Sequence, residues 1–309
     1  MKFSVSLASV LLVILALPLL WVKPGGARPN EAQSSRAQSP IKTIYPTFTT
    51  IDVPGEPVTE VYGINSQGNM VGFTARSYYD PNDRGFLYKG GKFIRVVYPG
   101  AYATSANGIN DAGLIIGEAD SQHGYLAKGF TYDGKTFTLF HHGSGGVTIA
   151  QGINNLNSIV GGFGTLDFRI GFMKNGRQFT KLHFPGNNGY ETATGINNVG
   201  EIVGYTYPDL NAYLYVNGRF RNIDVPGAVQ TEAWGISDSG VISGNYFTSP
   251  AVYGFALYNG QYISFSYPGA EGTYADGIND SGQVVGWYTL DYVAYHGFVT
   301  SPITAADFQ

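Results

Sequence analysis

The chain of 309 residues contains no cysteine, and only 13 % of its residues are charged. The absence of cysteine excludes disulfides, cysteine nucleophiles and thiolate metal sites, so stability must come from a large core. The net charge is −4 and no cluster of lysine and arginine occurs. Nucleic-acid binders neutralise phosphates with basic surfaces, so this class is excluded.

Glycine and aromatic residues are abundant instead, with 43 Gly, 15 Pro, 23 Tyr and 19 Phe. This composition favours short strands and tight turns over helices. Hydrophobic residues make up 43 % of the chain, which is enough to build a core and excludes a disordered chain. We therefore expect an all-β fold.

The N-terminus resembles an export signal. Lys2 precedes an apolar run from Phe3 to Val22, and small residues at 25–27 suit a signal peptidase. We expect residues 1–27 to be a cleaved signal peptide. An uncleaved N-terminal anchor is the alternative, because a run of 20 residues is long enough to span a bilayer. Either way, the remainder is predicted to be secreted, extracellular or periplasmic, and residues 28–45 have the polar composition of a flexible linker.

One phrase occurs six times, Gly-Ile-Asn-(Asp/Asn)-x-Gly-x-(Ile/Val)-(Val/Ile)-Gly, with departures at single positions. The copies begin at Gly63, Gly108, Gly152, Gly195, Gly235 and Gly277, which are 40 to 45 residues apart. Between the copies recur a Gly-Phe-(x)-Tyr phrase, a pair such as Asn259-Gly260, and a phrase that ends in Pro-Gly. Repeats of this length are typical of β-propellers.

Each repeat contains four short apolar stretches separated by turn signals. In the fourth repeat the expected strands are Glu191–Asn197, Glu201–Tyr207, Ala212–Val216 and Arg219–Val225. Three successive hairpins would make a four-stranded antiparallel sheet, the size of one propeller blade. The sixth repeat lacks its fourth strand, whereas residues 48–55 form such a strand without a third strand before it. We predict that residues 46–300 form a six-bladed β-propeller, closed by the N-terminal strand pairing in the last blade, with a C-terminal tail at 301–309.

The repeated phrase and the sequence His296-Gly297-Phe298 resemble the HAF repeats of bacterial extracellular repeat proteins. The resemblance covers about residues 46–300, and six-fold repetition makes the Gly-Ile-Asn phrase specific. The His-Ala-Phe signature is poorly kept, since the other repeats begin it with Arg84, Lys128, Ile170, Asn211 and Tyr253. The resemblance implies secretion and a propeller-like fold, and it implies no known reaction.

The loops are expected to differ between the two ends of the molecule. The turns after the first and third strands of each repeat are nearly uniform, whereas the loops after the second and fourth strands vary in length and concentrate Asp and Tyr. Binding residues belong on variable loops carried by a rigid scaffold. The first strands also vary three residues and one residue before each motif glycine. The candidate ligand-binding residues are Glu60, Tyr78, Tyr79, Asp80, His123, Tyr125, Asp167, Arg169, Tyr207, Asp209, Glu232, Trp234, Asp276, Asp291 and Tyr292.

Aromatic rings stack on the apolar faces of sugars, and carboxylates and amides pair with hydroxyls. We therefore expect a binding module for a glycan or another polar ligand at the Asp/Tyr-rich loop face. One alternative is a structural or protein-interaction surface protein, in which the rings only cover the loops. Another is a polysaccharide-active enzyme, either a hydrolase with Glu60 and Glu232 as acid and base or a lyase with Tyr125 and His123. No sequence feature selects a pair, so no catalytic residue is assigned.

No metal or cofactor site is predicted. The sequence Asn110-Asp111-Ala112-Gly113 and its counterparts resemble fragments of calcium loops, but each has one or two ligands where a calcium loop needs about five. The five histidines are spread over three repeats without the spacing of zinc ligands. We expect a monomer whose partner is a glycan or an extracellular protein, with no nucleic acid bound and with membrane contact only through an uncleaved N-terminal segment.

Overall fold

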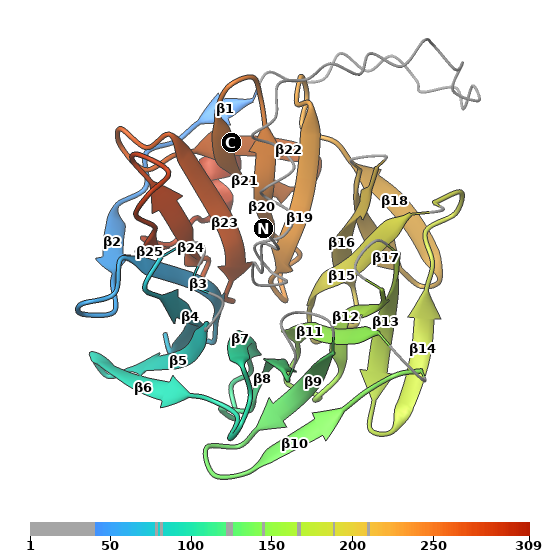
Figure 1. The fold of residues 1–309 in the computed structure, drawn as a ribbon. Coiled ribbons are helices and arrows are strands. Elements are labelled where there is room, and N and C mark those ends of the chain that lie inside the picture. Colours follow the sequence, from blue (N-terminus) through green and yellow to red (C-terminus); the bar gives the residue numbers. More distant parts are fainter. Residues whose placement is uncertain are drawn as a thin grey trace.

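The structure is a computed structural model that describes residues 41–77, 80, 83–121, 126–143, 146–165, 168–187, 189–208 and 211–309. Within these residues the chain forms strands and turns, with one short 3-10 helix, η2 (Ala305–Phe308). The strands are arranged radially around a common centre (Figure 1). The expected all-β class is confirmed. No helix in the described part of the chain is long and apolar enough to cross a lipid bilayer.

The strands of each repeat pair with one another in chain order. The first repeat gives β3 (Val58–Ile64), β4 (Met70–Ala75), β5 (Arg84–Lys89) and β6 (Lys92–Val96). The second gives β7 (Ala103–Ile109), β8 (Ile115–Asp120), β9 (Ala127–Tyr132) and β10 (Phe137–Phe140). The third gives β11 (Val147–Ile153), β12 (Ile159–Gly164), β13 (Arg169–Asn175) and β14 (Gln178–Leu182). Within each repeat, consecutive strands are antiparallel.

The last three repeats follow the same pattern. The fourth gives β15 (Tyr190–Ile196), β16 (Ile202–Tyr207), β17 (Ala212–Val216) and β18 (Arg219–Ile223). The fifth gives β19 (Gln230–Ile236), β20 (Ile242–Phe247), β21 (Val252–Tyr258) and β22 (Gln261–Phe265). The sixth gives β23 (Gly272–Ile278), β24 (Val284–Thr289) and β25 (His296–Thr300). These strands are again antiparallel to their neighbours in the repeat.

Neighbouring repeats are joined into three sheets of nine, eight and eight strands. The joint is a single parallel register pair, for example Arg84 with Thr104 between β5 and β7. Equivalent joints connect β13 to β15 and β21 to β23. Because each joint merges two repeats, a sheet in this molecule is a larger unit than a repeat.

The N-terminal strand completes the last repeat. β2 (Phe48–Ile51) pairs antiparallel with β25, with Phe48 opposite Thr300 (Figure 1). Beyond this pairing, His296 Nδ1 lies 2.8 Å from Asp52 Oδ2. The predicted pairing of the N-terminal strand in the sixth repeat is therefore confirmed, and it covers an edge that would otherwise be open.

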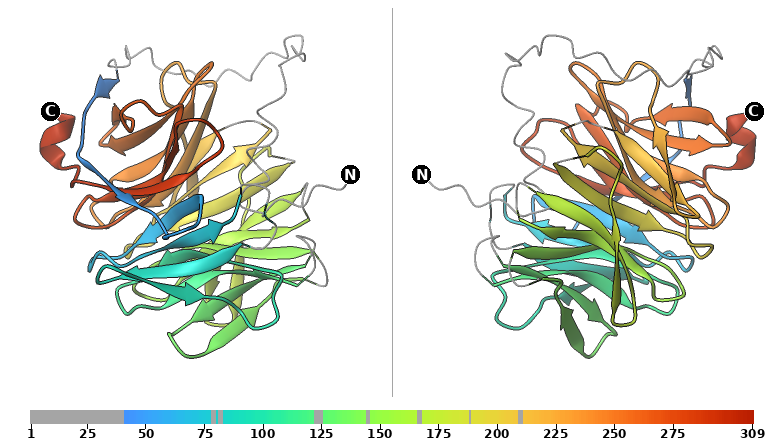
Figure 2. Two further views of the ribbon diagram at one scale, coloured as in Figure 1. Left: turned by 60° about the vertical axis from the view of Figure 1, so that its left-hand side comes forward. Right: turned by 90° about the vertical axis from the view of Figure 1, so that its right-hand side faces the viewer.

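Two short segments that the sequence placed in a linker and a tail pack against the repeats. β1 (Lys42–Thr43) lies within the predicted linker and pairs in parallel with β22. In the predicted tail, Ile303 and Phe308 are buried, and η2 lies at the periphery of the molecule (Figure 2). Lys42 Nζ donates hydrogen bonds to the carbonyl oxygens of Asp307 at 2.9 Å and Gln309 at 3.0 Å. The two ends of the described chain therefore hold each other.

The motif glycines lie where adjacent repeats meet at the centre. A methyl group on Gly195 would lie 2.7 Å from the Trp234 carbonyl oxygen, and one on Gly277 would lie 2.7 Å from the Tyr62 carbonyl oxygen. Neighbouring backbones therefore approach each other as closely as only glycine permits. Because the second contact joins the sixth repeat to the first, the repeats form a closed ring.

In five of the six repeats, the motif asparagine connects its repeat to the next one by a hydrogen bond. Asn65 Nδ2 donates to the Asn110 carbonyl oxygen at 3.1 Å. The same bond recurs from Asn110, Asn154 and Asn197. Asn279 closes the series by donating to the Asn65 carbonyl oxygen at 3.1 Å. In the fifth repeat Ser237 takes this place, and its Oγ accepts from the backbone of its own turn. The resemblance of these turns to calcium loops therefore reflects hydrogen bonds between repeats.

The core consists of layers between neighbouring repeats. The small or apolar residue two positions before each motif glycine is 0 % exposed in every repeat, at Val61, Ala106, Ala150, Ala193, Ala233 and Ala275. These small or apolar side chains therefore pack at the crowded centre of the ring. Larger side chains fill the outer part of each layer; for example, Phe130 of β9 packs with Val71 of β4 and Val96 of β6.

Candidate functional site

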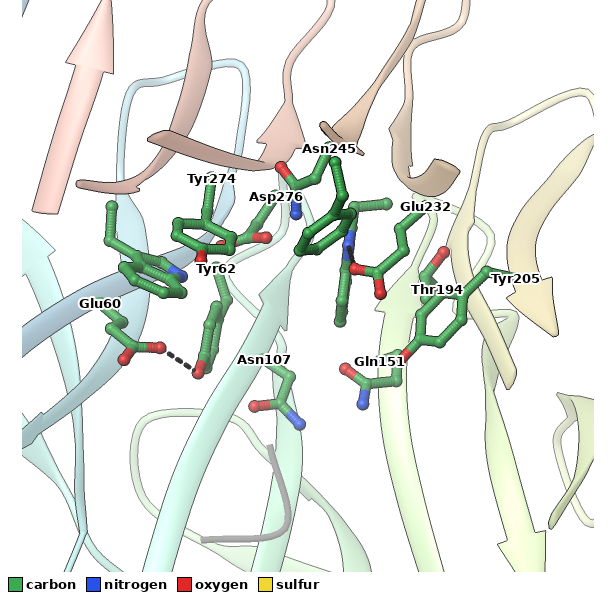
Figure 3. Close-up of a pocket in the computed structure, with 13 residues that line it drawn as sticks. Glu60, Tyr62, Asn107, Gln151, Thr194, Tyr205, Glu232, Asn245, Tyr274 and Asp276 are labelled. Carbon is green, nitrogen blue, oxygen red and sulfur yellow. Dashed lines mark hydrogen bonds between the residues drawn. The ribbon is translucent and has the colours of Figure 1, made fainter. Parts of the chain in front are cut away.

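A pocket opens at the centre of the ring, at the end opposite the asparagine turns. Val58 at the start of β3 lies opposite Ala75 at the end of β4, so the variable loop after β4 emerges at the pocket end. The other repeats have the same pairing, which places their variable loops at this end too. The residues that line the pocket are Glu60, Tyr62, Asn107, Gln151, Thr194, Tyr205, Glu232, Trp234, Asn245, Phe247, Tyr274, Asp276 and Trp287 (Figure 3).

Every repeat contributes the residue just before its motif glycine. These residues are Tyr62, Asn107, Gln151, Thr194, Trp234 and Asp276. In each first strand the register shifts at this position, for example between Val61 and Gly63. Such a β-bulge re-aims the extra residue. The bulge therefore turns one side chain from each repeat toward the centre. Three residues before the glycine, Glu60, Glu232 and Tyr274 also reach the pocket.

The second strands supply pocket residues that the sequence analysis missed. Tyr205, Asn245 and Trp287 each follow the last glycine of the motif, and Phe247 lies two residues beyond Asn245. The signal that could have found them is that glycine itself. At Gly204, Gly244 and Gly286 an added methyl group would overlap a carbonyl oxygen of the first strand. The close approach of the two strands carries the next residue of the second strand to the pocket.

Three carboxyl groups are buried in the pocket wall. The exposed fractions of Glu60, Glu232 and Asp276 are 3 %, 5 % and 6 %. The Tyr62 hydroxyl donates to Glu60 Oε2 at 2.6 Å. Gln230 Nε2 donates to Glu232 Oε1 at 2.5 Å, and the Trp234 indole N–H donates to Glu232 Oε2 at 3.2 Å.

Asp276 differs from the other two acids. Within the described residues, its Oδ2 is buried and has no hydrogen-bond partner. A buried polar atom without a partner is costly, and one that faces a pocket suggests that a bound molecule supplies the partner. Figure 3 shows Asp276 between Tyr274 and Asn245. This oxygen is therefore the strongest indication of a ligand in the pocket.

Burial controls the protonation of these acids. It raises the pKa of Glu60 from 4.5 to about 8, with the hydrogen bond from Tyr62 opposing the rise and the charge of Asp83 adding to it. Burial also raises the pKa of Glu232 from 4.5 to about 7, against the hydrogen bonds from Trp234 and Gln230. The pKa of Asp276 lies well above its usual range because burial and the nearby charges of Glu60 and Glu232 outweigh the lowering effect of hydrogen bonds with Asn245 and Trp287. The pocket therefore holds carboxyl groups that keep protons near neutral pH.

Aromatic rings form much of the remaining wall. Tyr274 and Trp287 are stacked, with ring centroids 3.7 Å apart and an interplanar angle of 10°. Tyr205 and Trp234 form a tilted pair at 5.4 Å. Tyr62 and Trp234 are partly exposed, whereas the other rings are buried. Rings therefore lie beside the carboxyl groups in the pocket wall, and Asn107, Gln151 and Thr194 complete it (Figure 3).

The cavity has a volume of about 60 Å³. A cavity needs about 10–15 Å³ to hold one water molecule, whereas sites for whole drug-sized ligands measure about 300–1,000 Å³. The pocket is therefore large enough for a few waters or for one end group of a ligand. The rest of such a ligand would lie above it, among the variable loops.

Four predicted site residues line the pocket, and these are Glu60, Glu232, Trp234 and Asp276. Arg169 lies elsewhere and is only 3 % exposed, because its guanidinium donates to the Tyr190 hydroxyl at 2.8 Å and covers the Tyr190 ring. Tyr207, at the end of β16, is 36 % exposed and is not part of the pocket wall.

Other predicted residues shape their own loops. Asp291 accepts hydrogen bonds from the backbones of Val293 and Ala294, and the Tyr292 hydroxyl donates to the Glu271 carbonyl oxygen. Asp80 Oδ2 accepts from the Arg76 backbone at 3.3 Å. The predicted residues Tyr78, Tyr79, His123, Tyr125, Asp167 and Asp209 lie outside the described residues. Among the residues that are described, no group of three or more His, Asp or Glu could hold a metal ion.

Comparison with known proteins adds information on the fold. No protein-family model matches the chain, and no curated protein sequence matches it. Among solved structures, the SapL1 lectin in complex with alpha methyl fucoside has a TM-score of 0.51 and 11 % identity, over 79 % of this chain and 95 % of the lectin. The inactive H270A virginiamycin B lyase from Staphylococcus aureus with quinupristin has a TM-score of 0.50 and 10 % identity, over 82 % of this chain and 99 % of the lyase.

A third similar structure is the β-propeller domain of the Trilobed protease from Pyrococcus furiosus, at a TM-score of 0.48 and 12 % identity, over 77 % of this chain and 78 % of that one.

The fold is a β-propeller. Its repeats surround one centre and its first and last strands pair, as a propeller requires. At these identities the likeness concerns the fold alone, because one propeller fold carries many unrelated functions.

Proposed function

We propose that each of the six repeats is one four-stranded blade of a six-bladed propeller. Support comes from the antiparallel pairing within every repeat and from the contact of Gly277 with the backbone of Tyr62. The merging of repeats into three sheets fits this proposal, because each joint between repeats consists of one register pair. The repeat phrase also supports membership of the HAF-repeat family, and with it an exported, extracellular or periplasmic protein.

We infer that this propeller is a binding module for a glycan or a similar polar ligand at the central pocket. The observation that carries the inference is the buried Asp276 Oδ2, which lacks a partner in the described structure while Trp234, Tyr274 and Trp287 stand beside it in the pocket wall. Sugars present hydroxyl donors for such an oxygen and apolar faces for such rings. The ligand's end group would enter the pocket, and the following units would lie among the variable loops.

The test is a glycan array with the purified protein, followed by calorimetry on each hit. Trp234→Ala should weaken binding by at least about tenfold, because the substitution removes a ring at the pocket and the donor to Glu232. Tyr45→Ala is the matched control, since Tyr45 is an aromatic residue that is 89 % exposed and outside the pocket. Equal binding by both variants would contradict the site, and no binding to any glycan would favour a protein-interaction or structural role.

A second candidate function is polysaccharide hydrolysis. One observation favours it: Glu60 and Glu232 have pKa values of about 8 and about 7, so they retain protons near neutral pH as a general acid must. Each bound glycan should therefore also be incubated with the protein, and products should be separated by chromatography. Shortened oligosaccharides that disappear with Glu232→Gln would establish the hydrolase, whereas unchanged glycan would leave the binding module.

A further inference from the structure

We propose that the central pocket selects a positively charged group, and that its ligand is an amino sugar whose free ammonium enters the pocket. This proposal rests on the proposed glycan-binding function and names the sugar class. It can fail while glycan binding itself stands.

The pocket wall contains acidic groups and no basic ones among its described lining residues. The pocket wall contains three carboxyl groups, at Glu60, Glu232 and Asp276, and none of the described residues that line it is lysine or arginine. Arg169 is occupied at the Tyr190 ring, 4.8 Å from the ring centroid. A cation in the pocket would therefore meet three acids and no lysine or arginine among the lining residues that the structure describes.

One carboxyl oxygen in the pocket wall, Asp276 Oδ2, is buried without a hydrogen-bond partner in the described structure. Asp276 is 94 % buried, because its exposed fraction is 6 %, and its Oδ2 has no hydrogen-bond partner among the described residues. An ammonium group carries three donors and no acceptor, so it matches an unpaired carboxylate oxygen better than a hydroxyl does. An arriving ammonium favours the ionised form of Asp276, and once the carboxyl group has released its proton, the hydrogen bond joins two charged groups and is shorter and stronger than a neutral one.

Aromatic rings that can attract a cation line the same pocket. Cations are attracted to the faces of Trp and Tyr within about 6 Å of the ring centre, and the attraction grows when water is excluded. The pocket offers Tyr62, Trp234, Tyr274 and Trp287 around the acids (Figure 3). The hydrogen bond from Trp234 to Glu232 at 3.2 Å and the stacking of Tyr274 on Trp287 hold the rings in place before a ligand arrives.

The pocket is small compared with sites that enclose whole ligands. Its volume of about 60 Å³ lies well below the roughly 300–1,000 Å³ of sites that hold whole drug-sized ligands, which favours a small end group such as an ammonium. An acetyl group on the same nitrogen would replace two donors with an apolar methyl group and an acceptor oxygen. The methyl group would lie among polar carboxyl groups, and only one N–H would remain for the unpaired Asp276 Oδ2, so N-acetylation should weaken binding.

Charge selection has a consequence that a neutral sugar would not share. An arriving cation favours the ionised form of nearby carboxyl groups and lowers their pKa values. Glu60 and Glu232, whose pKa values are about 8 and about 7 before binding, would then release protons into the solution. Binding of an ammonium group should therefore be coupled to proton release.

The experiment compares two probes by calorimetry, a trimer of glucosamine and a trimer of N-acetylglucosamine. Each is titrated at about pH 6 in two buffers of different ionisation enthalpy, because the difference between buffers counts the protons released. We expect the glucosamine trimer to bind at least about tenfold more tightly and to release about 0.5–1 proton per site. We expect the acetylated trimer to release none.

Asp276→Asn removes the carboxyl group that can ionise beside an ammonium and keeps the shape, so it should abolish the preference between the trimers. Glu232→Gln is a second variant in case Asp276→Asn does not fold. Glu271→Gln is the matched control, because this exposed glutamate does not line the pocket and its substitution should leave the preference unchanged. Equal binding of both trimers would overturn charge selection while glycan binding stands. Binding of neither trimer would overturn this proposal, and the glycan array would then decide the proposed function separately.

Discussion

The stability of the protein should fall as pH rises, because the pocket acids are protonated in the native state. The pKa of Glu232 is raised from 4.5 to about 7 by burial. A group with a raised native pKa stabilises the fold fully below its unfolded value, and this contribution is lost as pH rises through the native value. At about 1.4 kcal/mol per pKa unit, Glu232 alone should cost about 3 kcal/mol of unfolding free energy between pH 4.5 and about pH 7.

The perturbation is Glu232→Gln, which cannot ionise. Urea unfolding followed by circular dichroism at several pH values between about 4.5 and 8 gives the unfolding free energy of wild type and variant. The wild-type value should fall across this range, and the fall should be smaller by about 3 kcal/mol in the variant. Comparing slopes removes any constant cost of the altered hydrogen bonds to Gln230 and Trp234.

Glu271→Gln serves as the control, because it changes the same charge at an exposed position outside the pocket. It should keep the wild-type slope. If Glu232→Gln also kept the wild-type slope, Glu232 would not be held protonated by burial. The argument for a pocket of neutral acids would then fail for this residue.

Three further predictions concern the closed ring. Gly195→Ala should lower the unfolding free energy by at least about 2 kcal/mol, since the methyl group would press on the Trp234 carbonyl; an unchanged thermal midpoint would contradict the close approach. Asn279→Ala should cost about 1–2 kcal/mol in urea unfolding by removing the bond to Asn65, and no cost would mean that this closure adds nothing. Deleting residues 41–52 should expose the edge of β25 and cause aggregation in size-exclusion chromatography; a stable monomer would refute the role of β2.

The ring could be predicted from the sequence because its causes are local and repeated. Each Gly-Ile-Asn phrase specifies the same turn, and the unmatched strand at residues 48–55 leaves one place for its partner. In the third repeat Asn157 replaces the turn glycine and adopts a φ of 60°, a conformation that asparagine tolerates. The extra pairing of β1 with β22 could not be predicted, because two residues in a polar segment carry no strand pattern.

The site was predictable only where it follows the repeat register. Glu60, Glu232, Trp234 and Asp276 occupy fixed positions before the motif glycine, so their variability was visible in the sequence. Trp287 and Tyr205 were missed, because their direction depends on how closely the second strand approaches the first. Asp291 was predicted to bind a ligand, but its carboxylate accepts from the backbone of its own loop, which composition alone does not distinguish.

The motif glycines, which lie where neighbouring repeats meet at the centre of the ring, also limit how the molecule can change in evolution. On Gly152, Gly195 and Gly277, an added methyl group would lie 2.7 Å from a carbonyl oxygen of the next repeat. A ring with one repeat fewer or one more would have a different angle between neighbouring repeats, so these contacts would change at every joint. A solenoid can gain or lose units at its ends with little effect on the rest. In this chain, duplication or deletion of a repeat would have to be accompanied by new residues at the motif-glycine positions of all the remaining repeats.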